Sequence, residues 1–161
     1  MTDPRALLAE LRSALADAGA RDELLARVAE RRVLGVRRKQ VFEPVERVWR
    51  LGVLLLGRSG TLYATGHTIR VERLRVDNHQ SNVAAERRAV RDLALRSGID
   101  EGETLNYAAP PLDLGDPHPP LVAGPGGLRV RWTRSDPDAT VALEPYLRER
   151  AALLTDPPAG A

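Results

Sequence analysis

The first apolar pattern along the chain is that of a helix. Its leucines are three and four positions apart and share one helix face: Leu7, Leu8, Leu11 and Leu15. Asp3 and Pro4 provide the capping residue and the first-turn proline of a helix start. Gly19 follows as a typical helix stop. These residues predict a helix at the amino terminus.

A second, shorter helical pattern comes directly afterwards. Asp22 is its expected cap, and three apolar residues share a face behind it: Leu24, Leu25 and Val28. Two helices joined by a short glycine-containing connection form a helical hairpin. Residues 1–31 are therefore predicted to be an N-terminal helical hairpin.

Beyond this region the period changes to that of β-strands. Residues 45–56 alternate at first and then become continuously apolar, as a strand does when both faces are covered. Gly52 within this run indicates a bulge or a close backbone contact. Residues 57–60 predict a turn and 61–65 the returning strand of a hairpin, and extended alternation resumes over 68–74.

An amphipathic helix follows these strands. Asp77 with Gln80 three residues later resembles a capping box, although Ser81 or Asn82 could cap the helix instead. Gly98 marks its end. Its predicted apolar face consists of Val83, Val90, Leu93 and Ala94.

A long irregular segment separates the last elements from the rest. Residues 104–107 favour a strand, whereas residues 108–127 hold six prolines and four glycines and cannot sustain a helix or a central strand. A structureless segment of that length is typical of a lid, a binding loop or disorder.

The C-terminal part predicts a strand pair and a helix. Residues 128–133 alternate strictly and place three apolar residues on one side: Leu128, Val130 and Trp132. Residues 140–143 read as the returning strand, and Pro145 begins a final helix.

Together these elements predict an α+β fold. We expect a twisted, mainly antiparallel sheet of about five strands with helices packed on one side, preceded by the helical hairpin. Residues 32–154 are expected to form one compact unit with that hairpin, and residues 155–161 a disordered tail.

Composition excludes several classes of protein. The 161 residues include no cysteine, which excludes disulfides, thiolate catalysis and cysteine-ligated metal sites. The longest apolar run, residues 51–56, is far shorter than a membrane span. The amino terminus lacks a basic segment followed by an apolar one. We therefore expect a cytoplasmic protein without a membrane segment.

Charge is unevenly distributed along a nearly neutral chain, which has 24 Lys and Arg against 22 Asp and Glu. Residues 27–76 have a basic surplus, whereas residues 99–127 contain five carboxylates and no Lys or Arg. A basic cluster of this kind binds phosphate, RNA or an acidic protein surface, unless the acidic segment folds over it and neutralises it. The candidate binding residues are Arg37, Arg38, Lys39, Arg47 and Arg50.

Candidate catalytic groups are scattered. The turn at Ser59 lacks the glycine spacing of a hydrolase elbow and lies between two predicted strands. His67, Asp77 and His79 could converge as metal ligands or, with Ser59 or Ser81, as a hydrolytic group. Helix capping by Asp77 and plain exposure of His79 explain the same residues. No phosphate-cradling loop is present, because the only lysine follows an arginine. We expect no metal and no cofactor.

Four stretches carry a resemblance. They are residues 32–37 (Arg-Val-Leu-Gly-Val-Arg), 48–56 (Val-Trp-Arg-Leu-Gly-Val-Leu-Leu-Leu), 62–66 (Leu-Tyr-Ala-Thr-Gly) and 102–104 (Gly-Glu-Thr). Together they resemble a family of small uncharacterised bacterial proteins, some of which bear the name glutaminase. The resemblance covers most of residues 30–155, but its motifs are strands and turns, so it transfers no catalytic residue. Serine-dependent glutaminases use Ser-x-x-Lys. Here Val36, and not a serine, stands three residues before the only lysine, so this motif is missing.

The leading functional hypothesis is a non-enzymatic binding or regulatory module. Its five basic candidates would engage an acidic protein or a phosphate-bearing ligand. Nucleic acid is a further option, although aromatic platforms for base stacking are scarce. The alternative is a small amide hydrolase using the catalytic candidates above. A homodimer formed through a sheet edge or the N-terminal hairpin is also open.

Overall fold

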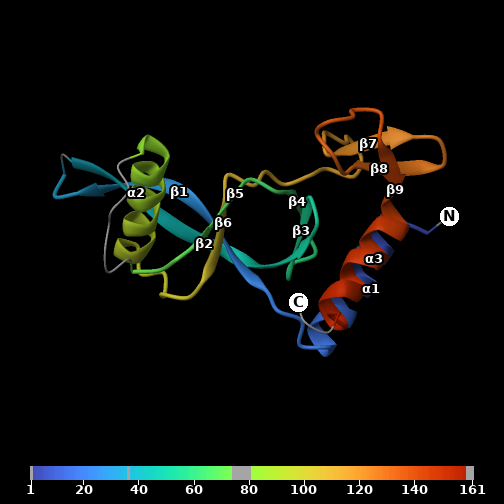
Figure 1. The fold of residues 1–161 in the computed structure, drawn as a ribbon, viewed down its shortest axis with the longest axis horizontal. Coiled ribbons are helices and arrows are strands. Elements are labelled where there is room, and N and C mark those ends of the chain that lie inside the picture. The colour runs from blue at the N-terminus through green and yellow to red at the C-terminus, as the bar shows by residue number, and fades with distance from the viewer. Residues whose placement is uncertain (1, 36, 74–80, 159–161) are drawn as a thin grey trace. The chain divides into compact units, whose positions relative to one another are not determined.

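The structure of the protein is a computed structural model that describes residues 2–35, 37–73 and 81–158. Within these residues it has three helices and nine strands, which confirms the α+β class (Figure 1). The helices are α1 (Pro4–Asp17), α2 (Asn82–Arg96) and α3 (Leu143–Thr155). The strands are β1 (Glu23–Val33), β2 (Arg37–Leu51), β3 (Leu54–Gly57), β4 (Leu62–Ala64), β5 (His67–Arg70), β6 (Thr104–Tyr107), β7 (Leu121–Gly124), β8 (Gly127–Arg131) and β9 (Thr140–Ala142).

The strands form two sheets, not the single sheet that the sequence predicts. The first has the order β4-β3-β2-β1-β6-β5 and is mixed, because β1 pairs with β6 in parallel. The second is the antiparallel sheet β7-β8-β9. Leu121–Gly124 supplies a partner for β8 from within the proline-rich segment, so β8 and β9 have a sheet of their own.

By its internal contacts the chain divides into two compact units, each with its own apolar core. Unit 1 comprises Met1–Asp22, Arg47–Thr65 and Pro110–Ala161. Unit 2 comprises Glu23–Glu46 and Gly66–Ala109. Strand β2 continues from unit 2 into unit 1. No helix in the described parts of the chain is long and apolar enough to cross a membrane.

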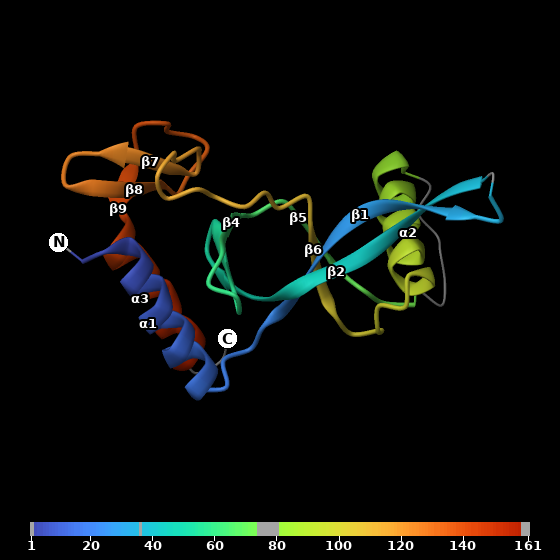
Figure 2. The ribbon, with the colours of Figure 1, turned by 180° about the vertical axis from the view of Figure 1, so that it is seen from behind.

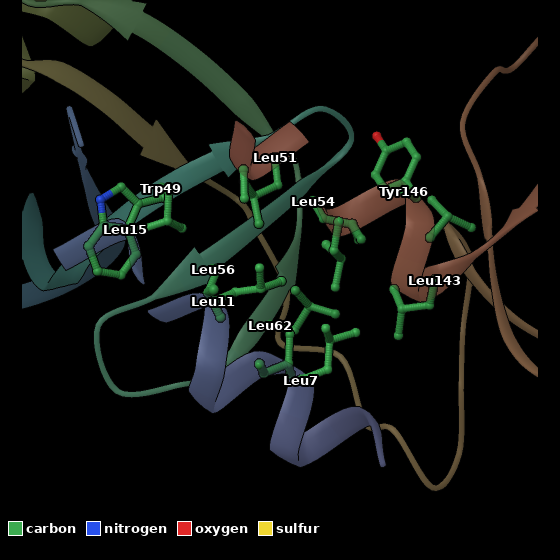
Figure 3. Close-up of a cluster of buried hydrophobic side chains, with 14 of the residues drawn as sticks. Leu7, Leu11, Leu15, Trp49, Leu51, Leu54, Leu56, Leu62, Leu143 and Tyr146 are labelled. Carbon is green, nitrogen blue, oxygen red and sulfur yellow. The ribbon is translucent and has the colours of Figure 1, made fainter. Parts of the chain in front are cut away.

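In unit 1, helices α1 and α3 pack together over β3 (Figure 3). Helix α1 begins as predicted, since the Asp3 carboxylate accepts the Arg5 amide (3.2 Å) and Pro4 is the first helical residue. The predicted leucine face is buried along its whole length: Leu7, Leu8, Leu11 and Leu15. Gly19 lies just beyond the helix with φ +61°.

The apolar run at residues 45–56 is two strands, so the prediction of one strand is wrong. Strand β2 ends at Leu51, and β3 returns antiparallel from Leu54, directly opposite it. Gly52 makes the tight turn with φ +67°, and the Val53 amide donates to the Tyr146 hydroxyl of α3 (2.9 Å). The sequence hides this turn because no polar residue interrupts the apolar run of residues 51–56, and Gly52 is its single local signal.

The proline-rich segment is built into unit 1. The Ala64 amide donates to the Pro110 carbonyl (3.0 Å), and the Leu112 amide donates to the Leu62 carbonyl (2.8 Å). The segment therefore runs along β4 before Leu121, which is fully buried, begins β7.

The second predicted helix is strand β1, so the N-terminal helical hairpin is wrong. Leu24 pairs with Leu105 of β6, and Leu24 and Ala26 belong to the core of unit 2. Leu25 is also buried. The segment fits both helical and strand periods, and long-range pairing with β6 decides between them.

In unit 2, α2 packs its Ala94, Val90 and Leu93 against the core, as predicted, whereas Val83 is exposed. The Ser81 side chain caps the helix by accepting the Ala84 amide (3.2 Å). The alternative cap at Asp77 and Gln80 lies outside the described residues. Gly98 follows the helix with φ +83°.

Candidate functional site

The end of the hairpin formed by β1 and β2 extends beyond α2 in both views (Figures 1 and 2). Near α2 the hairpin is anchored, because Ala26 of β1 and Phe42 of β2 are buried in the core of unit 2. The Phe42 amide also donates to the Ser97 hydroxyl just beyond the C-terminus of α2 (2.9 Å). We call residues 31–40, the far end, the hairpin tip.

The hairpin tip is strongly basic. Its ten residues include five Arg and Lys and no Asp or Glu. The exposed basic side chains that the structure describes there are Arg31, Arg32, Arg38 and Lys39. Arg37 belongs to β2, but its side chain lies outside what the structure describes. Two of the predicted binding residues, Arg38 and Lys39, thus lie on an exposed, protruding element.

Acidic side chains next to the tip form ion pairs with two of these basic side chains, Arg31 and Arg38. Glu43 accepts hydrogen bonds from Arg27 (2.9 Å) and Arg31 (3.4 Å), and Glu30 pairs with Arg38 (3.5 Å). The hydrogen bonds from Arg27 and, to a lesser extent, Arg31 hold the pKa of Glu43 below its ordinary value despite some burial. These pairs are exposed and contribute little to folding. Arg32 and Lys39 form no ion pair within the described residues.

Positive charge lies on both faces of the tip. Successive side chains of a strand point to opposite faces. Arg31 and Arg32 are neighbours on β1, and Arg38 and Lys39 are neighbours on β2. A partner that surrounds the hairpin can therefore contact basic groups on each side of it.

An apolar side chain stands at the turn of the hairpin. Leu34 is 96% exposed and has φ +54°, followed by Gly35 with φ +76°. A leucine in this left-handed conformation costs roughly 1–2 kcal/mol. Asn or Gly would satisfy the turn without that cost. An almost fully exposed leucine adds little to the core, and residues held in strained turns are concentrated at functional positions.

Arg47 and Arg50 belong to unit 1, whereas the residues of the hairpin tip belong to unit 2. Arg47 donates to Asp22 Oδ1 from Nε (3.0 Å) and Nη2 (2.7 Å), and Arg58 donates to Oδ2 from its Nε (3.0 Å) and Nη2 (2.7 Å). Burial raises the pKa of Asp22, but the hydrogen bonds and charges of both arginines outweigh it and hold the pKa below its ordinary value. Arg47 therefore has an internal partner, and Arg50 is half-buried opposite Leu55.

A second basic surface in unit 2 is a groove of about 590 Å³ beside α2. Four arginines line it, together with the carboxylates of Glu72 and Asp92. Because the acidic groups offset half of that charge, this groove is a weaker candidate than the tip.

Among the catalytic candidates, Ser59 and Ser81 have local structural roles. The Ser59 hydroxyl donates to the Thr61 hydroxyl (2.9 Å) in the β3–β4 turn, and Ser81 caps α2. The His67 ring lies 5.2 Å from the Tyr107 ring, centre to centre. Asp77 and His79 lie outside the described residues. Within the described chain, no three His, Asp or Glu side chains are grouped closely enough to hold a metal ion.

The sequence did not suggest Arg31, Arg32 and Leu34 as candidate binding residues, because the segment up to residue 31 was predicted to be helical. Their signal was the pattern Arg-Arg-Val-Leu-Gly-Val-Arg-Arg-Lys, a basic run on either side of a glycine turn. Comparison with known proteins finds no matching family model, curated protein or solved structure.

Proposed function

We propose that this protein is a non-enzymatic binding module that engages double-helical nucleic acid through the hairpin tip. The observation that carries the proposal is the tip itself: a protruding two-stranded ribbon with five basic residues and no acidic one. Two-stranded β-ribbons of known DNA-binding proteins enter the major or the minor groove of the duplex.

The distribution of charge favours a groove over a flat surface. A ribbon in a groove meets phosphates on both walls, and the tip has basic side chains on both faces: Arg31, Arg32, Arg38 and Lys39. A flat acidic protein surface would contact only one face. Binding to phosphates also releases condensed counterions, which supplies most of the affinity of a sequence-independent binder.

Leu34 has a role in this arrangement. Proteins that enter the minor groove insert apolar wedges, leucine among them, between base steps. Leu34 is the exposed apolar residue at the turn and is flanked by the basic strands. We propose that it contacts base edges or a base step while the arginines hold the phosphates.

The test is equilibrium binding of a fluorescent duplex to the full chain, compared with the variant Arg32→Glu/Lys39→Glu. Neither residue has an ion-pair partner among the described residues, so the variant should fold normally. Affinity should fall at least about tenfold. The matched control is Arg5→Glu/Arg21→Glu in unit 1, which changes net charge by the same amount on exposed residues. Equal losses in both variants would show that only net charge matters and would overturn the proposal.

Leu34→Asn separates the wedge from the charge. Asparagine tolerates the left-handed turn, so the stability of the variant should be equal or higher, while duplex affinity should fall. Unchanged affinity would remove Leu34 from the interface. Tighter binding to a polyglutamate chain than to duplex would assign the tip to an acidic protein instead.

A further inference from the structure

Unit 1 contains a groove of about 500 Å³ on the side of β8 where the chain leaves the strand. Its walls come from the residues after β8, from the proline-rich segment and from the end of β4. We propose that this groove binds a nucleoside phosphate, with the base stacked on Trp132 and the phosphate paired with Arg131 and Arg134. The proposal does not depend on the hairpin tip.

Trp132 is the first element of the argument. The sequence predicts it on the same side as Leu128 and Val130, but β8 ends at Arg131 and Trp132 is 52% exposed. The chain's other tryptophan, Trp49, is fully buried. The half-exposed Trp132 ring is therefore not part of the apolar core. Aromatic side chains in this state are typical platforms for nucleobases.

The charge of the lining is the second element. Arg131 and Arg134 line the groove, and among the residues that the structure describes no carboxylate does. The Arg131 Nε donates to the Pro137 carbonyl (2.9 Å). This bond orients the guanidinium and leaves its two terminal nitrogens for a ligand. Neither arginine forms an ion pair within the described residues. Guanidinium groups bind phosphate through paired N–H donors.

The third element is the apolar wall. Four prolines line the groove: Pro110, Pro119, Pro120 and Pro137. Their rings, with Val53 and Ala64, make up the apolar part of the lining. Pockets of roughly 300–1,000 Å³ with an apolar lining and a few charged groups are typical small-molecule sites. Inorganic phosphate would leave these apolar side chains unused, whereas a planar base attached to a phosphate would use both the apolar and the charged parts of the lining.

The test is titration with adenosine 5′-monophosphate, followed by tryptophan fluorescence and by calorimetry. Stacking should quench the emission of Trp132 and leave that of buried Trp49. Adenosine and inorganic phosphate should each bind at least about tenfold more weakly, since each lacks one half of the ligand. A short oligoadenylate shows the source: tighter binding than the mononucleotide indicates single-stranded nucleic acid, and equal binding indicates a free nucleotide.

Variants keep the test independent of folding. By calorimetry, Trp132→Ala and Arg134→Gln should each weaken binding about tenfold. Arg21→Gln, an exposed arginine of unit 1 outside the groove, should bind like the wild type. No binding at millimolar nucleotide, or undiminished binding by Trp132→Ala, would overturn the proposal. So would preferential binding of an acidic peptide.

Discussion

Asp22 joins two arginines of unit 1 in a single ionic cluster. Its side chain is 17% exposed, and four guanidinium nitrogens contact its two oxygens. Arg58 also lies over the Trp49 ring, with its Cζ 4.9 Å from the ring centre. Asp22→Asn should reduce the free energy of unfolding at neutral pH by about 2 kcal/mol, because it removes charge from these hydrogen bonds. Urea unfolding followed by Trp49 fluorescence measures the change.

The same cluster predicts a dependence on pH. The folded pKa of Asp22 lies below the ordinary value of 3.8, so its stabilisation is complete above that value and is lost as the pH falls through the folded pKa. The difference between wild type and Asp22→Asn should therefore shrink only in strongly acidic solution. A difference that already disappears near neutral pH would contradict this account.

Position 52 requires glycine for two reasons, its backbone conformation and the nearby Tyr146 side chain. Its φ is +67°, and a Cβ at this position would overlap the Tyr146 hydroxyl, which must then give up the Val53 amide. Gly52→Ala should lower the stability of the protein by about 3 kcal/mol in urea unfolding. Gly19→Ala is the matched control, because Gly19 has a similar φ of +61° in open space. Its cost should be only about 1 kcal/mol, and equal costs would refute the steric argument.

Among strands, β6 depends on one buried amide. Asn106 is fully buried, and its side chain donates to the Glu23 carboxylate (2.6 Å) of β1 and accepts from the Thr68 hydroxyl (2.9 Å) of β5. Side-chain hydrogen bonds thus join three adjacent strands of unit 2. Asn106→Leu should destabilise unit 2 by about 2 kcal/mol, since partners on both sides lose their bonds.

Amide hydrogen exchange of β1 and β6 would report the effect of Asn106→Leu directly. Thr68→Val, which removes one of these bonds from the exposed strand β5, should have a smaller effect. Unchanged protection of β1 in Asn106→Leu would show that the amide does not hold the strands.

Elements differ in how far local sequence specifies them. Helix α1 could be predicted because its cap, its proline and its leucine spacing all lie within 14 residues. Strand β1 could not, because Leu24, Leu25 and Val28 fit a helix equally well. Its conformation is fixed by pairing with Leu105, far away in the sequence. The second sheet could not be predicted either, because its strand β7 lies inside a proline-rich segment and is defined by pairing with β8.

The whole molecule is nearly neutral, with a formal charge of +2, while the ten residues of the hairpin tip contain five basic groups. Charge density along the sequence was enough to predict Arg38 and Lys39 as candidate binding residues, because a basic run is visible without a structure. It could not show that Arg47 is paired with Asp22, or that Trp132 leaves the core, since both depend on contacts between distant segments. Binding is expected to follow the local charge of the tip, not the net charge.

The most direct test of this claim is the salt dependence of duplex binding. Each phosphate neutralised changes the slope of log affinity against log salt by about 0.9. Arg32→Gln/Lys39→Gln should therefore reduce the slope by about 1.8 relative to the wild type, whereas Arg5→Gln/Arg21→Gln should leave it unchanged. A slope that is the same in all three proteins would contradict the assignment of the hairpin tip as the nucleic-acid interface.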